Sequence, residues 1–117
     1  MIFYRECDGR SWVLDWLDSI PMRARDKCRV RIERLTEVGH ELRRPEADYL
    51  GEAIYELRAK HLRINYRMLY FFHGRELAVI SRGFVKQQTS VPPREIRAAI
   101  RDKRNFENDP VRHTHQE

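Results

Sequence analysis

The sequence predicts one α+β domain whose elements follow the order β-α-α-β-β-β-α. Three observations lead to this prediction: apolar residues recur with helical spacing before residue 39, alternate with strand spacing between residues 53 and 85, and return to helical spacing after Pro93. Because the strands follow one another, we expect a small, mostly antiparallel sheet with the two N-terminal helices packed on one face. The other face is expected to stay partly open.

The length and charge set limits on the class of protein. The chain has 117 residues, which fits a single domain at 1–107 followed by a flexible tail at 108–117, where no periodicity remains. Lys and Arg total 23 against 18 Asp and Glu, a net charge of +5 that favours polyanionic partners. An ordinary domain with solvated lysines and arginines would have the same balance.

The start of the chain and its two cysteines indicate the compartment. The first residues contain no apolar segment with a cleavage site, and no apolar run reaches membrane length, so we expect a cytoplasmic protein with no membrane partner. Cys7 and Cys28 have neither disulfide-framework nor metal spacing, so we expect buried free thiols.

The N-terminal third predicts a strand and two helices. Residues 2–7 are rich in strand formers and end at Asp8-Gly9. One helical face follows, formed by Trp12, Val13, Trp16, Leu17 and Ile20. Pro21 ends this helix and suits the first turn of a second, basic amphipathic helix, for which Gly39 is the expected C-cap.

The rest of the chain predicts a polar loop, three strands and a last helix. Residues 40–51 have no periodicity, whereas residues 53–60, 62–72 and 77–85 alternate as strands, with a tight turn at 73–75. Pro92 and Pro93 open the final helix, with Ser90 as a possible N-cap.

Between residues 58 and 86 the sheet is strongly basic. Glu76 is the only acidic residue there, against the bases Arg58, Lys60, Arg63, Arg67, Arg75, Arg82 and Lys86. Tyr66, Tyr70, Phe72 and Phe84 lie among these bases, a composition typical of RNA-binding surfaces. The alternative is that the arginines extend into solvent and the tyrosines belong to the core.

No other site in the sequence has comparable support. The five histidines are scattered, and there is no glycine-rich phosphate loop, nucleophile elbow or Cys/His signature. We therefore expect no metal and no cofactor. If the protein cuts RNA, cations and tyrosines must do so without a metal.

Three segments stand out as motifs. Residues 50–58 read LGEAIYELR, residues 66–72 read YRMLYFF, and GFVK at 83–86 is followed by PPREI at 92–96. These segments resemble motifs of the RelE/ParE toxin superfamily, and more narrowly its phage-derived, HigB-like branch. The resemblance implies the RelE fold and a toxin neutralised by a cognate antitoxin, usually of the helix-turn-helix type. It also implies metal-independent endonuclease cleavage of mRNA, commonly on the ribosome, which inhibits translation.

The resemblance also assigns roles to residues. Arg58 would hold the scissile phosphate, Arg67 would support it, and Lys86 would stabilise charge or transfer a proton. Lys60, Arg63, Arg82 and Tyr66 would bind RNA, although core packing explains Tyr66 equally well.

The sequence departs from the branch after Lys86. Gln87, Gln88, Thr89 and Ser90 replace a stretch that usually holds further lysines, which should weaken RNA binding and flatten its salt dependence. Two other functions therefore stay open: a ParE-like inhibitor of DNA gyrase, and a catalytically weak binding module that acts with its antitoxin. The motifs favour the HigB-like branch over ParE, but one fold hosts both.

Overall fold

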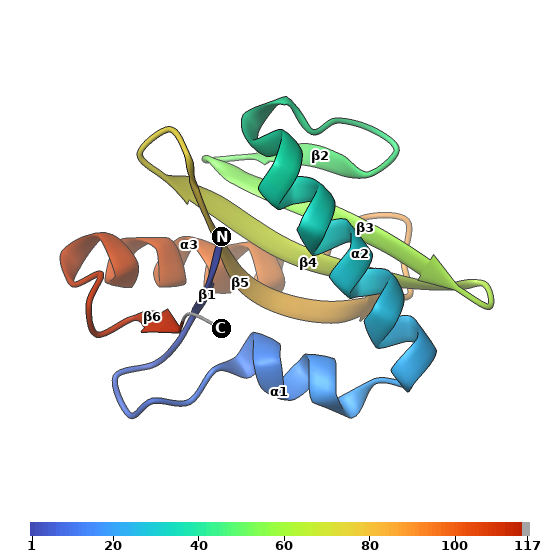
Figure 1. The fold of residues 1–117 in the computed structure, drawn as a ribbon, viewed down its shortest axis with the longest axis horizontal. Coiled ribbons are helices and arrows are strands. Elements are labelled where there is room, and N and C mark those ends of the chain that lie inside the picture. Colours follow the sequence, from blue (N-terminus) through green and yellow to red (C-terminus); the bar gives the residue numbers. More distant parts are fainter. Residues whose placement is uncertain (116–117) are drawn as a thin grey trace.

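The computed structural model describes residues 1–115 and confirms the predicted RelE-like α+β fold (Figure 1). Three helices, α1 (Trp12–Ser19), α2 (Met22–Val38) and α3 (Pro93–Asn108), accompany the short 3-10 helix η1 (Gly39–Glu41). One sheet contains β1 (Ile2–Tyr4), β2 (Ala47–Gly51), β3 (Ile54–His61), β4 (Ile64–His73), β5 (Leu77–Lys86) and β6 (Thr114–His115). The strand order is β2-β3-β4-β5-β1-β6, and only the β1–β5 pair is parallel.

The two N-terminal helices pack on one face of the sheet, as predicted. The Ser11 hydroxyl caps α1 by accepting a hydrogen bond from the Leu14 backbone N–H at 3.5 Å. Helix α2 ends at Gly39, whose φ of 63° is easy for glycine. The buried residues of α2 are those of the predicted apolar stripe: Ala24, Cys28, Ile32 and Leu35.

The second face of the sheet is covered by α3, which corrects the expectation of an open face (Figure 1). Ala99 and Phe106 of α3 are buried against Leu69 and Phe71 of β4 in a second apolar cluster. The apolar stripe of α3 is narrow and its sequence is highly charged, so the periodicity gave little sign of a covering helix. Pro92 precedes α3 without a side-chain cap, so Ser90 does not serve as one.

The expected polar loop at 40–51 contains a further strand, β2, which pairs with the first half of β3. The pairing runs from Gly51 opposite Ile54 to Ala47 opposite Leu57, and Glu46 then accepts a backbone hydrogen bond from Arg58 at 2.8 Å. No described strand pairs with this edge of β3 beyond that point. The last residues of β3 therefore form an open sheet edge.

The C-terminal segment is docked through residue 115, which corrects the expected flexible tail for the described part of 108–117. Strand β6 pairs with β1, with Thr114 opposite Tyr4. The imidazole of His113 is 7% exposed and stacks on the Tyr4 ring with centroids 5.1 Å apart. Aromatic stacking and strand pairing hold this segment, although its sequence has no periodicity. The last two residues of the tail lie outside the described part.

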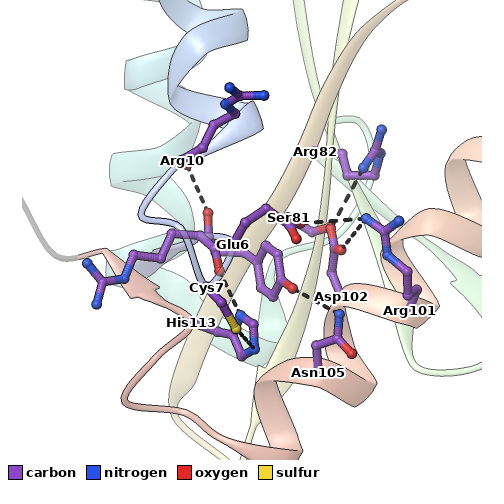
Figure 2. A network of polar contacts seen from close by, with 12 residues as sticks. Glu6, Cys7, Arg10, Ser81, Arg82, Arg101, Asp102, Asn105 and His113 are labelled. Atoms are coloured by element: carbon purple, nitrogen blue, oxygen red, sulfur yellow. Dashed lines mark hydrogen bonds and ion pairs between the residues drawn. The ribbon is translucent and has the colours of Figure 1, made fainter.

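The two cysteines differ in exposure. Cys28 is buried in α2 as expected, and burial raises the pKa of its thiol to about 11. Cys7 is also a free thiol but is exposed, with its Sγ 3.7 Å from Nε2 of His113 (Figure 2). Cys7 stands between the charged residues Glu6 and Asp8, so the expectation of burial was wrong for this cysteine.

A buried carboxylate joins α3 to β5. Ser81 has no partner in the β4–β5 register, because Leu69 faces Arg82 and Tyr70 faces Ile80. This bulge lets the Ser81 hydroxyl donate a hydrogen bond to Asp102 at 2.7 Å, while Arg101 donates to the other carboxylate oxygen at 3.1 Å (Figure 2). Asp102 is fully buried, and this burial raises its carboxyl pKa despite the hydrogen bonds and the nearby arginines.

Asp102→Asn is expected to gain stability relative to the wild type as the pH rises from about 4 to about 7. The folded carboxyl binds its proton more tightly than the unfolded one, whose ordinary pKa is 3.8. Its contribution to stability is therefore complete below that value and is lost as the pH rises through the folded pKa. Urea denaturation of both proteins across this range gives the difference, and a difference that is constant or moves the other way contradicts the prediction.

A close approach between α1 and β5 involves a glycine. The Trp16 indole lies against Gly83 of β5, where an added Cβ would fall 2.0 Å from the Cε3 atom of the indole ring. The same indole packs at a tilt against Tyr66 of β4, with centroids 6.2 Å apart. Because glycine has no Cβ, Gly83 leaves room for the Trp16 indole.

Candidate functional site

The sheet register places Arg58 and Arg67 side by side. Arg58 of β3 is the direct partner of Arg67 on β4, and Arg67 in turn faces Phe84 on β5. Phe84 belongs to the cluster under α3, so this row of side chains lies on the α3 face of the sheet. In the next row on the same face, Asn65 stands between Lys60 and Lys86.

Glu56 connects the two arginines. Its carboxylate is 1% exposed, and one oxygen accepts a hydrogen bond from Arg58 Nε at 2.8 Å. Its other oxygen lies 3.2 Å from Arg67 Nε, an ion pair that lacks the angle of a hydrogen bond. The hydrogen bond to the buried Glu56 carboxylate fixes the orientation of the Arg58 guanidinium.

The two arginines have different access to solvent. The Arg67 side chain is 10% exposed, and burial lowers its pKa although the nearby Glu56 carboxylate acts in the opposite direction. The Arg58 side chain is 27% exposed. Arg58 is therefore accessible to a ligand, whereas Arg67 is nearly buried and contacts Glu56.

A pocket opens beside Arg58 at the start of α3. Its volume is about 340 Å³, and Lys86, Arg58 and Asp48 line it together with Arg44, Leu50, Glu56, Thr89, Ser90, Val91 and Ile96. Lys86 forms no side-chain hydrogen bond or ion pair within residues 1–115. It therefore contributes an uncompensated positive charge to the pocket.

Asp48 is the acidic counterpart at the rim of this pocket. Its carboxylate lies 2.7 Å from Arg44 and 3.4 Å from Arg58. The hydrogen bond from Arg44 lowers the pKa of Asp48, so the group stays ionised at neutral pH. Its contact with Arg58 is long and only half-buried, so an incoming anion can compete for the Arg58 guanidinium.

A second hollow of about 280 Å³ continues from Arg58 toward α2. Its lining includes Arg58, Lys60, Asn65 and Arg67 from the sheet and Arg31 from α2, with Pro45 and Ala59. Arg31 reaches the open edge of β3, where it donates a hydrogen bond to the Arg58 carbonyl at 2.9 Å. The predicted residues Arg58, Arg67, Lys60 and Lys86 thus lie in one region.

Three other predicted RNA-binding residues have different surroundings. Arg63 lies in the β3–β4 turn with a φ of 67°, exposed and outside both hollows. Arg82 is held by Glu95 at 3.1 Å and lies 3.8 Å from Asp102. Tyr66 is 3% exposed in the core, which favours the packing alternative, so we leave it out of the proposed RNA surface.

Sequence reasoning missed Glu56, Asp48 and Arg44. For Glu56 a signal existed: it stands two residues before Arg58 in a strand, so the two side chains share a face. Asp48 and Arg44 had no such signal, because β2 was not predicted.

The described residues contain no alternative metal or membrane site. Across residues 1–115, no three His, Cys, Asp or Glu side chains gather closely enough to bind a metal ion. Within the same range, every helix is too short or too polar to cross a bilayer. The ionisable groups that line the pocket are the guanidinium groups of Arg44 and Arg58, the ammonium group of Lys86 and the carboxylates of Asp48 and Glu56.

The fold and the paired arginines define a small RelE-like α+β protein with a basic pocket on its sheet. The family described as phage derived protein Gp49-like (DUF891) matches residues 15–104, and this chain belongs to that family, which is part of the RelE/HigB-like toxin group. The matched range contains Arg58, Arg67 and Lys86. A comparison with curated proteins finds no significant match.

Proposed function

We propose that this protein is the toxin of a type II toxin–antitoxin pair and that it cleaves mRNA, as a HigB-like endoribonuclease acting on the ribosome. The main support is the geometry of Arg58. The buried Glu56 carboxylate fixes the orientation of the Arg58 guanidinium by a hydrogen bond. Arg58 also lines a pocket together with Lys86, which is unpaired within residues 1–115. Membership of the Gp49-like family is consistent with this function.

In the proposed reaction a general base takes the proton of the ribose 2′-hydroxyl, whose oxygen attacks the adjacent phosphorus and forms a 2′,3′-cyclic phosphate. The bond to the 5′-oxygen of the next nucleotide breaks, and this oxygen takes up a proton as it leaves. Arg58 holds the phosphate and stabilises the extra negative charge of the transition state. Lys86 adds a second cation, or gives a proton to the departing 5′-oxygen. Arg67 acts as a positioning residue, because it reaches Arg58 through Glu56 rather than through the RNA.

The proposed partners are a cognate antitoxin of the helix-turn-helix type and the ribosome with its bound mRNA. An antitoxin that covers the Arg58 pocket would keep the toxin silent by excluding the phosphate. No cofactor and no metal ion take part in the proposed reaction.

One observation favours a second candidate, a weak binding module that works with its antitoxin. Thr89 and Ser90 line the pocket in the stretch where related toxins carry lysines. Asp48 also occupies one side of the Arg58 guanidinium. Both features lower the affinity for a phosphate without changing the fold.

Arg58→Ala is expected to lower the rate of transcript cleavage by about 100-fold, the typical effect of removing one donor to a developing anion. The measurement is induced expression in a bacterium, with 5′ ends of transcripts mapped within minutes. The matched control is Arg104→Ala, which removes an exposed arginine in the second half of α3 that does not line the pocket.

Each outcome of this experiment favours one function. New internal 5′ ends with wild type and Arg104→Ala, but not with Arg58→Ala, support the nuclease. Intact transcripts with halted replication indicate gyrase inhibition. Intact transcripts with normal growth, at proven expression, indicate the binding module.

A further inference from the structure

We propose that the RNA strand bound at Arg58 continues over the open edge of β3 into a groove between β3 and α2, where Lys27 and Lys60 hold a further phosphate. This inference rests on the proposed nuclease function and names the path of its substrate. The groove is defined here by its lining: Lys27, Val30, Arg31, Ala59 and Lys60.

The groove exists because β2 is shorter than β3. Beyond Leu57 no described strand covers the outer edge of β3, and α2 runs across the sheet above it (Figure 1). The space between them has a volume of about 220 Å³. A strand of RNA could enter it without displacing any secondary structure.

The groove is continuous with the pocket at Arg58. It shares Arg31, Ala59 and Lys60 with the hollow of about 280 Å³ described above. That hollow shares Arg58 with the pocket of about 340 Å³ that contains Lys86. The three spaces form one path from the start of α3, over the sheet edge, to the outer surface of α2.

The charges along this path favour a polyanion. Lys27 and Lys60 are exposed and make no ion pair within residues 1–115. The Glu46 carboxylate is bound by the groove residue Arg31 at 2.9 Å and by Arg34 at 3.0 Å. The hydrogen bonds from Arg34 and Arg31 lower the pKa of Glu46, so this carboxylate is ionised at neutral pH and its charge is compensated by the two arginines.

The shape of the path favours single-stranded RNA. Recognition of a duplex uses shape over roughly 16 base pairs across its broad minor groove. Here the path bends over a strand edge and consists of small hollows, which suit a flexible backbone. Val30, 54% exposed, and Ala59 give the groove an apolar floor on which a ribose or base can rest.

The test compares RNA of two lengths under changing salt. Binding of a dinucleotide and a 12-nucleotide single strand, both 2′-O-methylated to prevent cleavage, is followed by fluorescence anisotropy. The variant is Lys27→Gln with Lys60→Gln. The matched control is Lys103→Gln with Arg104→Gln, which removes two positive charges from α3.

For the longer RNA, the slope of log affinity against log salt is expected to become shallower by about 0.7 in the groove variant, because one single-strand phosphate contact is lost. The dinucleotide fills only the Arg58 pocket, so its slope should not change. The control should leave both slopes as in the wild type. Circular dichroism and urea denaturation verify that both double variants fold.

The inference is overturned if the variant affects both lengths equally, if it affects neither, or if the wild type does not bind the longer strand. It is also overturned if the variant binds the 12-mer normally but loses association with ribosomes, since the lysines would then contact ribosomal RNA. Failure of the nuclease function is seen separately, as intact transcripts with the wild type in cells.

Discussion

Glu56→Ala lowers the free energy of unfolding by about 3 kcal/mol, the expected cost of leaving a buried charge without its partner. Within residues 1–115, Glu56 is the one carboxylate that contacts Arg67, and it also accepts a hydrogen bond from Arg58. Arg58 can turn toward water when Glu56 is removed, but Arg67 is 8% exposed and cannot. Urea denaturation at pH 7 measures the loss.

Two further variants separate charge from packing. Glu56→Gln keeps the shape and one hydrogen-bond acceptor for Arg58, so it should cost less than alanine. Adding Arg67→Met to Glu56→Ala removes the stranded charge and should recover most of the lost stability. If the loss of unfolding free energy in the double variant equals the sum of the losses in the two single variants, the ion pair is not the source of the effect.

Gly83→Ala is expected to destabilise the protein by about 3 kcal/mol, the upper end of the cost of overpacking. The new Cβ would lie 2.0 to 2.5 Å from three atoms in the body of the Trp16 indole. A rigid ring cannot yield at one atom, so α1 must shift as a whole or Trp16 must leave Tyr66. Thermal and urea unfolding both report the change.

The explanation requires that Trp16 be the obstacle. Trp16→Leu in the Gly83→Ala background should therefore cost less than Trp16→Leu in the wild type, a coupling that a double-mutant cycle measures. Gln87→Ala, at an exposed position just after β5, serves as the control for an added alanine. No coupling between positions 16 and 83 would contradict the packing argument.

Where periodicity was strong, the sequence predicted the fold well. The two N-terminal helices and strands β3, β4 and β5 lie where apolar spacing placed them, with small shifts at their ends. Strands β2 and β6 were missed because neither has an alternating apolar pattern. Strand β6 is held by its pairing with β1, which lies at the other end of the chain. Strand β2 is held by a tight turn that pairs it with β3.

The candidate site could be predicted only in part. Motifs led to Arg58, Arg67 and Lys86, and the register brings these residues into two adjacent rows. The acidic partner of each cation could not be predicted. An alternating strand pattern predicts which face of the sheet a side chain lies on, but not which residue it contacts. Arg82 illustrates this, since its partners Glu95 and Asp102 come from a helix that the sequence did not place on that face.

The docking of β6 affects the tendency of the protein to self-associate. Strand β1 is three residues long, and β6 occupies the edge that would otherwise lie open beside it. An uncovered edge of this kind recruits strands from other molecules and begins aggregation. Strand β6 thus protects this edge, and a protease that removed it would leave a protein prone to aggregation.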